Sequence, residues 1–152
     1  MRRLHVIPTL LVFVLFVASI DAQSNQIEDR LLDQKAATFG DAAYMILAAA
    51  GTIPQDASPA DAVAAVQSGK LLRGSHTETQ PITLGEVCYL IMETQKMNGG
   101  LFYMLFPGPR YAAREFAYLR LIRGNTHPAR TVAGEEVIRM LGDAMALKGG
   151  QS

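Results

Sequence analysis

The sequence of 152 residues lacks tryptophan and contains a single cysteine, Cys88. One cysteine cannot form a disulfide within the chain, and its place on the apolar side of a predicted helix indicates a buried core residue rather than a reactive thiol. Basic and acidic residues number 14 each, so the net charge of zero gives no argument for a nucleic-acid or polyanion partner. Apolar residues make up 49% of the chain, which predicts a compact helical domain rather than a disordered one.

Patterns typical of catalytic and metal sites are missing too. His76 and His127 lie in separate predicted loops without a second histidine or a cysteine pair at metal-ligand spacing, so we expect both side chains to be solvated. The sequence contains no glycine-rich phosphate loop and no Gly-x-Ser-x-Gly nucleophile motif. The adjacent Glu135 and Glu136 would point about 100° apart on a helix, so they cannot act as an acid/base pair. We expect no catalytic residue, metal or cofactor, and therefore no enzyme.

The N-terminus has the layout of a secretory signal peptide. A basic start, Met1–Arg3, precedes an apolar run from Leu10 to Ile20 that ends among small residues. We place cleavage after Ala22. A retained membrane anchor is the alternative, but the run is short for the ~20 residues that span a bilayer. We expect an exported protein, periplasmic or at the cell surface. The predicted layout is a signal peptide at 1–22, a flexible lead-in at 23–35, a helical domain at 36–147 and a tail at 148–152.

Helix-start signals divide the domain into elements. Thr83 and Glu86 have the spacing of a capping box, Ser58-Pro59-Ala60-Asp61 combines a cap with proline at the first helical position, and Thr38 with Asp41 is a weaker box. The predicted helices run from Thr38 to Gly51, from Ser58 to Gly69, from Thr83 to about Met97, from about Arg110 to Arg123, and onward from Thr131. We expect an all-α fold, with about five main helices arranged as capped hairpins around one core.

The helix starts form an internal repeat with a period of about 45 residues. Thr38-Phe39-Gly40-Asp41 corresponds to Thr83-Leu84-Gly85-Glu86 and, with one residue inserted, to Thr131-Val132-Ala133-Gly134-Glu135. Between these starts lie helices of a second type. One ends in Gly-Lys-Leu-Leu-Arg-Gly at 69–74 and the other in Leu-Arg-Leu-Ile-Arg-Gly at 119–124.

This alternation resembles the S-layer homology (SLH) domain over about 36–147. That family opens its first helix with Thr-Arg-Ala-Glu and its second with Trp-Ala. The resemblance implies a non-catalytic module of the bacterial cell envelope that binds cell wall polymer or peptidoglycan. The family's opener arginine is associated with holding anionic polymer, and this chain has Phe39, Leu84 and Val132 there. The family's tryptophan is replaced by Pro59 or Tyr111. These departures favour the alternative, a periplasmic protein-binding adaptor or assembly subunit that keeps the fold without polymer binding.

A basic stretch is the best candidate for ligand binding. Arg110 and Arg114 lie one turn apart on a predicted helix, where both could bind one phosphate or carboxylate, and Tyr111 could stack on a sugar ring. The candidate ligand-binding residues are Arg110, Tyr111, Arg114 and Arg123. The alternative is a solvated helix face whose arginines, Arg120 and Arg130 included, pair with Glu115, Glu135 or Glu136.

The apolar run from Leu101 to Phe106 is the second candidate, and we expect it to form a short turn of helix. If exposed, it would be a patch that docks a protein or a lipid surface through Leu101, Phe102, Tyr103 and Phe106. If buried, it would fill the space between the two hairpins. Burial is favoured, because a small domain without tryptophan needs large apolar side chains in its core.

Overall fold

The structure is a computed structural model that describes residues 25–150. Within that range every regular element is a helix, so the all-α prediction is confirmed. In chain order the elements are an N-terminal helix (residues 25–32), α2 (Phe39–Ala49), α3 (Pro59–Ser68), α4 (Leu84–Thr94), α5 (Leu101–Leu105), α6 (Pro109–Tyr118) and α7 (Gly134–Gly149). None of the helices in this range has the length and apolar character needed to cross a membrane. The predicted signal peptide lies outside the described residues.

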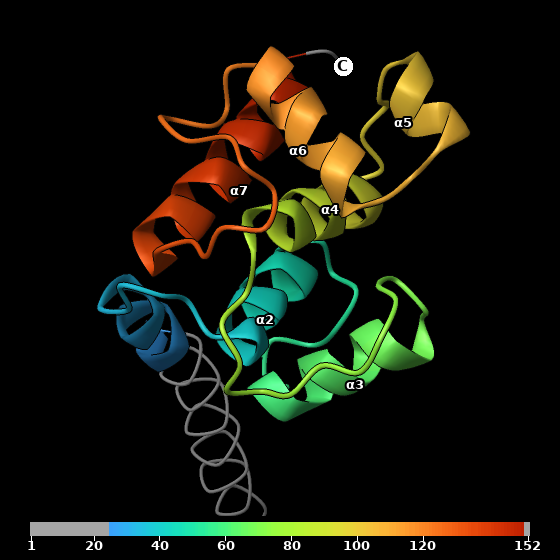
Figure 1. Cartoon of the computed structure of the whole chain (residues 1–152). Helices are drawn as coiled ribbons and strands as arrows, with labels where there is room; N and C mark the ends of the chain where they lie inside the picture. Colours follow the sequence, from blue (N-terminus) through green and yellow to red (C-terminus); the bar gives the residue numbers. More distant parts are fainter. Residues whose placement is uncertain (1–24, 151–152) are drawn as a thin grey trace, which may run out of the picture.

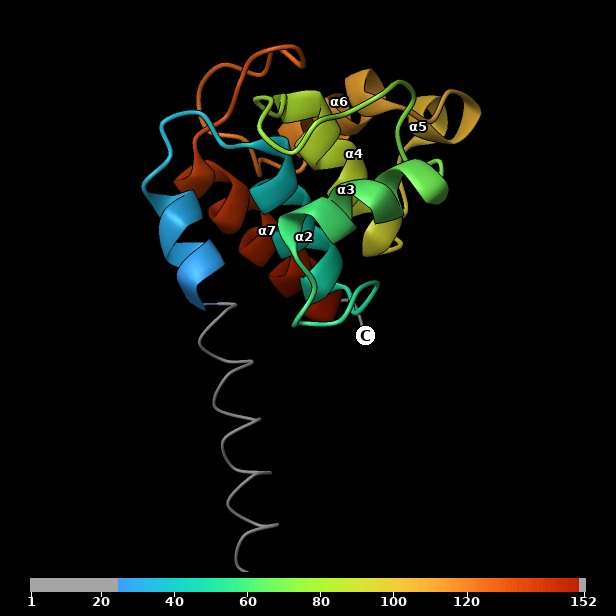
Figure 2. The same ribbon diagram turned by 90° about the horizontal axis from the view of Figure 1, so that it is seen from below.

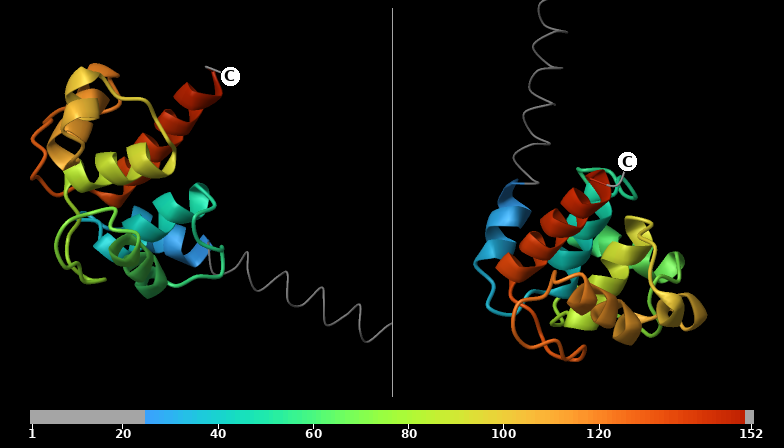
Figure 3. Two further views of the ribbon diagram at one scale, coloured as in Figure 1. Left: turned by 90° about the vertical axis from the view of Figure 1, so that its right-hand side faces the viewer. Right: turned by 90° about the horizontal axis from the view of Figure 1, so that it is seen from above.

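The core lies between three central helices. α2, α4 and α7 contact one another in pairs, α3 packs on α2, and α6 packs on α4 (Figure 1). The α2–α3 and α4–α6 units form the lower and upper halves of the molecule as Figures 1 and 3 show it. The largest fully buried side chains come mainly from the central helices and include Phe39, Tyr44, Leu84, Leu90, Ile91 and Met140. Cys88 is fully buried among them, as the sequence predicts.

Two of the three predicted capping boxes form. Ser58 Oγ accepts from Asp61 N at 3.2 Å, and Ser58 N donates to the Asp61 carboxylate at 2.8 Å. Thr83 Oγ1 accepts from Glu86 N at 3.4 Å, while Thr83 N donates to Glu86 Oε2 at 2.8 Å. Each box satisfies backbone donors that the first helical turn would otherwise leave unpaired.

The box predicted at Thr38 is wrong. In the part of the chain that the structure describes, the Thr38 side chain makes no capping hydrogen bond. The Asp41 carboxylate instead accepts from Arg30 and from Gln34 Nε2, and Gln34 Oε1 accepts from Thr38 N at 2.7 Å. The Asp41 carboxylate therefore binds Arg30 of the N-terminal helix instead of Thr38 N, and Gln34 Oε1 accepts the hydrogen bond from Thr38 N.

The segments before the three central helices interlock in a ring. The first amide of each central helix donates to a carbonyl in the segment that precedes the next one. The three bonds join Phe39 N to Gln80 O (2.7 Å), Leu84 N to Arg130 O (2.8 Å) and Gly134 N to Gln34 O (2.9 Å). Isolated antiparallel bridges between Thr38 and Pro81 and between Thr83 and Thr131 belong to the same ring. The structure thus arranges the internal repeat cyclically.

The N-terminal helix completes this ring and is part of the core. Residues 25–32 lie next to the start of α7 (Figure 2), and their Ile27 and Leu31 are buried. The helix precedes α2 as α3 precedes α4 and as α6 precedes α7. The sequence predicts a flexible lead-in at 23–35. The structure differs, because the two apolar side chains lie one turn apart and bury one face of the helix.

Three helices, α3, α4 and α6, end where a non-glycine residue adopts a left-handed conformation. Lys70, Lys96 and Arg120 have φ values of 52°, 52° and 58°, each directly after a C-cap. Leu121 N then donates to Phe116 O at 2.9 Å, the bond of a Schellman motif. The helix predicted to reach Arg123 therefore ends at Tyr118, and the one predicted to reach Met97 ends at Thr94.

The last helix begins later and ends later than predicted. Its N-cap is Ala133 rather than Thr131, so Glu136 and not Glu135 takes the third helical position. The helix continues to Gly149, into the residues predicted as a tail.

Candidate functional site

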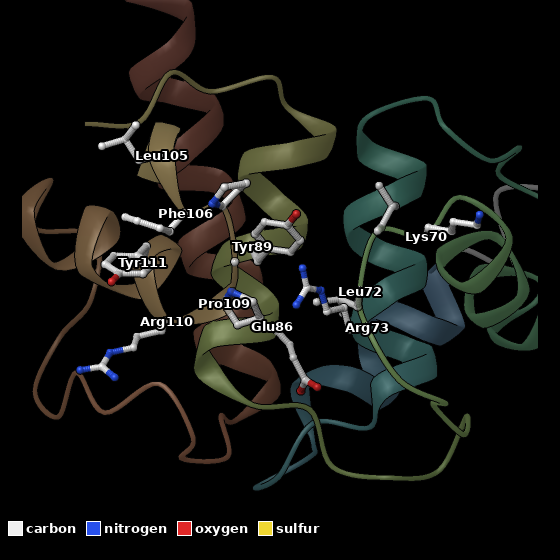
Figure 4. A pocket seen from close by; sticks show the side chains of 13 residues that line it. Lys70, Leu72, Arg73, Glu86, Tyr89, Leu105, Phe106, Pro109, Arg110 and Tyr111 are labelled. Atoms are coloured by element: carbon white, nitrogen blue, oxygen red, sulfur yellow. The ribbon is translucent and has the colours of Figure 1, made fainter. Parts of the chain in front are cut away.

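A groove of about 680 Å³ lies between the two halves of the molecule. It is bounded by the segment after α3, by one face of α4, and by the loop and first turn that join α5 to α6 (Figure 4). Two of the predicted ligand-binding residues, Arg110 and Tyr111, line it. Four other lining residues could contact a ligand and were not predicted from the sequence, namely Lys70, Arg73, Glu86 and Tyr89.

The first wall consists of residues 70–73. The left-handed conformation of Lys70 turns the chain back along α3, and Leu72 is buried in the core. The next residue, Arg73, is exposed and faces the groove, and in Figure 4 its guanidinium lies between Tyr89 and Glu86. Among residues 25–150 no carboxylate pairs with Arg73, so its charge is available to a ligand.

Glu86 lines the groove, and both of its carboxylate oxygens have hydrogen-bond partners. Its Oε2 accepts from the backbone and the hydroxyl of Thr83, both at 2.8 Å, and its Oε1 lies 3.2 Å from His76 Nε2. The third residue of each central helix is acidic, and its carboxylate lies beside a basic side chain. The pairs are Asp41 with Arg30, Glu86 with His76, and Glu136 with Arg130. Both carboxylate oxygens of Glu86 therefore already have partners within the protein.

His76 corrects a sequence-based expectation. It was predicted to be solvated, but it is buried and its ring stacks on Phe39 with centroids 4.4 Å apart. Its Nδ1 has no hydrogen-bond partner among the described residues. The residues next to His76 in the sequence do not predict its burial, because its partners Phe39 and Glu86 come from two different helices. His127 is exposed, as predicted.

Aromatic rings line the groove beside the cations. Tyr89 lies one turn after Glu86 on α4, and its pKa is raised by burial and by the charge of Glu93, while Arg73 acts in the opposite direction. Tyr111, in the first turn of α6, has its ring centroid 6.4 Å from that of Phe102 and 6.1 Å from that of Phe106. The groove thus combines a free guanidinium with two phenol rings.

The predicted basic stretch separates into different environments. Arg110 borders the groove but extends away from its centre (Figure 4), while Arg114 and Arg123 are exposed and do not line it. Arg130 forms a bidentate ion pair with Glu136, with N–O distances of 2.9 and 2.5 Å. The alternative of ion pairing is therefore correct for Arg130, and the predicted four-residue ligand set is not brought together in one place.

The run from Leu101 to Phe106 forms a short helix, as predicted, but the expectation of burial is wrong. Tyr103 alone is buried, and its hydroxyl donates to Glu93 Oε1 at 2.6 Å. The five exposed large apolar residues, which we call the α5 patch, are Leu101, Phe102, Met104, Leu105 and Phe106. Glycines precede α5 and Pro107-Gly108-Pro109 follows it, so the element projects from the upper half of the molecule in Figure 1.

In the next repeat, the residue that corresponds to Tyr89 makes hydrogen bonds within the protein. Arg139 follows Glu136 by three residues on α7, as Tyr89 follows Glu86 on α4. Arg139 Nη1 donates to Leu121 O at 3.1 Å and lies 3.4 Å from Asp143. Arg139 is therefore bonded within the protein, whereas the groove has Tyr89 at the corresponding position of α4.

The described residues include no group of three histidine, cysteine, aspartate or glutamate side chains that could hold a metal ion. The groove is lined by the guanidinium groups of Arg73 and Arg110, the ammonium group of Lys70, and the phenol rings of Tyr89 and Tyr111. Comparison of the chain with family models, with curated proteins and with solved structures finds no significant match.

Proposed function

We propose that the protein is an exported, non-catalytic module of the bacterial cell envelope, and that its groove binds an anionic cell wall polymer. The observation that carries this proposal is the unpaired guanidinium of Arg73 between Tyr89 and the engaged carboxylate of Glu86. A guanidinium binds a phosphate or carboxylate in a bidentate manner, and a phenol ring offers a flat face to a sugar. Together they suit a charged glycan better than an uncharged one.

The resemblance to SLH repeats supports the same function, but the ligand contacts must differ from those of that family. Phe39, Leu84 and Val132 stand where the family has its opener arginine, and all three are buried in the core. They cannot contact a polymer. In this proposal Arg73, with Arg110 and Lys70 at the margins of the groove, supplies the positive charge from different elements.

Co-sedimentation of the protein with purified peptidoglycan sacculi, with and without attached anionic polymer, tests the proposal. We expect Arg73→Gln to weaken binding by about tenfold, since one charge-assisted contact is worth roughly 1.5 kcal/mol. Arg123→Gln is the matched control, because Arg123 is an exposed arginine outside the groove. Equal binding by the wild type and the Arg73 variant at low salt would exclude the groove as the polymer site.

The export part of the proposal has a separate test. Mass spectrometry of the N-terminus of the protein recovered from the envelope fraction should find a chain that begins near residue 23. An intact N-terminus would instead support the retained anchor.

A protein-binding adaptor or assembly subunit is the second candidate function. The burial of Phe39, Leu84 and Val132 favours it, because the chain has lost the contacts by which the resembling family holds polymer. Crosslinking in cells that yields one dominant protein partner, together with no sedimentation on sacculi, would select the adaptor over the polymer-binding module.

A further inference from the structure

We propose that the α5 patch, together with the exposed face of α6, docks the protein on the surface of an anionic phospholipid bilayer. This inference goes beyond the polymer-binding function and does not depend on Arg73, the residue that carries that function. Leu101 and Met104 are 68% and 72% exposed, and Phe102, Leu105 and Phe106 are each about 60% exposed. Large apolar side chains gathered on one projection of a small protein mark an interaction site.

The shape of the patch suits a lipid layer. At about 100° per residue, the exposed positions 101, 102, 104 and 105 cover an arc of about 160°, opposite the buried Tyr103. An apolar helix face of this kind enters the headgroup boundary of a bilayer by ~5–10 Å. Tyr103 fixes the element to α4 through Glu93, so the wedge is held in place before it meets a surface.

The polarity of the patch separates a lipid partner from a protein partner. From Leu101 to Pro109 the chain has no charged side chain, and its one hydroxyl, on Tyr103, is engaged with Glu93. Protein interfaces carry about one hydrogen bond per 100–200 Å² around an apolar centre. A hydrocarbon layer needs no such bonds and can surround a convex projection on several sides at once.

The neighbouring charges are complementary to an anionic surface. From residue 97 to 134 the chain contains five arginines and a single carboxylate, Glu115. Arg110 and Arg114 lie one turn apart on α6, are exposed, and make no ion pair with any residue in the range 25–150. Tyr111, between them in sequence, contacts both Phe102 and Phe106, so the arginines stand beside the patch.

Tyr118 extends the same surface. It is 82% exposed and lies two turns after Tyr111, on nearly the same stripe of α6. Tyrosine is typical of the membrane–water interface, where its ring is shielded and its hydroxyl stays hydrated. Leu105 and Phe106 belong both to the patch and to the rim of the groove, so docking would place the groove opening near the lipid headgroups.

The absence of tryptophan allows a site-specific test. Phe102→Trp places one fluorophore in the patch, and Ala64→Trp places one on the exposed face of α3, at the opposite end of the molecule in Figures 1 and 3. The protein is purified after expression of the full chain and mixed with vesicles of phosphatidylcholine, with or without about a third phosphatidylglycerol. We expect the Phe102→Trp emission to shift to the blue and to be quenched by brominated lipid chains in the anionic vesicles.

Control variants distinguish a lipid surface from a second copy of the chain or another protein as the partner of the α5 patch. The Ala64→Trp emission should not change, and Arg114→Gln should weaken partitioning about fivefold at low salt, the effect of one basic residue near an anionic surface. Vesicle binding that leaves the Phe102→Trp probe unquenched would overturn the proposal, because the protein would then bind through another part. A blue shift without vesicles that accompanies dimerisation would assign the patch to a second copy. The α5 patch would belong to a protein partner if lipid did not quench the Phe102→Trp probe and if a protein crosslinked to the wild type were no longer crosslinked to the Phe102→Asp variant.

Discussion

Gly134 lies against the main chain of Leu31, so closely that an added Cβ would stand 1.6 Å from the Leu31 carbonyl oxygen. The contact closes the ring of repeats, since Gly134 N also donates to Gln34 O beside it. The N-terminal helix is thus joined to the start of the last helix, α7, and not only to its neighbour in sequence.

Gly134→Ala should therefore destabilise the protein by roughly 3 kcal/mol, because neither backbone can move without breaking the ring. Gly142→Ala is the matched control in the same helix, where the described residues place nothing within 4 Å of the added Cβ. That change should stabilise by about 0.5–1 kcal/mol through helix propensity. Urea unfolding followed by circular dichroism measures both. A Gly134→Ala protein as stable as the wild type would contradict the close contact.

Thr83→Ala should lower the free energy of unfolding by about 1 kcal/mol, because Thr83 Oγ1 caps α4 and bonds Glu86. Thr38→Ala at the equivalent position of α2 should change it by less than about 0.5 kcal/mol, since the Thr38 side chain makes no capping hydrogen bond. Thermal and urea unfolding of the two variants compare them directly. Equal losses would show that the Thr38 hydroxyl contributes as much as that of Thr83.

Tyr103 should make the protein less stable at alkaline pH. Burial, followed by the hydrogen bond to Glu93 and its charge, raises the pKa of Tyr103. The folded state thus keeps the phenol proton to higher pH than the unfolded state, so this contribution to stability is complete below about pH 10 and is lost as the pH rises above it.

Tyr103→Phe tests that sign. The variant should lose roughly 1.5 kcal/mol near neutral pH, the value of a hydrogen bond to a charged group, and its stability should fall less steeply between pH 9.5 and 11. Tyr44 and Tyr89, whose pKa values are also raised by burial, should leave part of the decline in place. Urea unfolding across this pH range is the measurement, and an unchanged slope would show that Tyr103 titrates normally.

Cys88 should not react with thiol reagents in the folded protein. Burial, with a smaller effect of the Glu136 charge, raises the pKa of the Cys88 thiol, so the thiol stays protonated at pH 8. Ellman's reagent should release no colour from the native protein within an hour and should react with one equivalent after unfolding in urea. Stoichiometric labelling in native buffer would mean that α4 opens readily on that timescale.

Local signals predicted much of the fold. The Ser58 and Thr83 boxes form as expected, Gly51 and Gly69 end their helices, and the apolar spacing on α4 faces the core. These features depend on residues within about one helical turn of each other, so a sequence pattern contains all the groups that take part.

Other predictions failed where a residue distant in sequence competes with the local pattern. Asp41 bonds to Arg30 rather than to Thr38, and His76 is buried because Phe39 and Glu86 surround it. α6 ends at Tyr118 because Arg120 adopts a left-handed conformation that its side chain does not favour. For Asp41 and His76 the competing partner comes from another element, whereas the end of α6 is closed by its own backbone bond from Leu121 N to Phe116 O.

The candidate site follows the same division. Arg110 and Tyr111 were predictable as a cation and an aromatic ring on one helix turn, but Arg73 and Tyr89 join them only because α3, α4 and α6 meet. The sequence by itself determined the helices, their caps and the presence of a repeat, since these depend on contacts between near neighbours. Only the tertiary structure decided which cations stay unpaired and that the Leu101–Phe106 run is exposed, since both depend on which distant surfaces the packed helices leave uncovered.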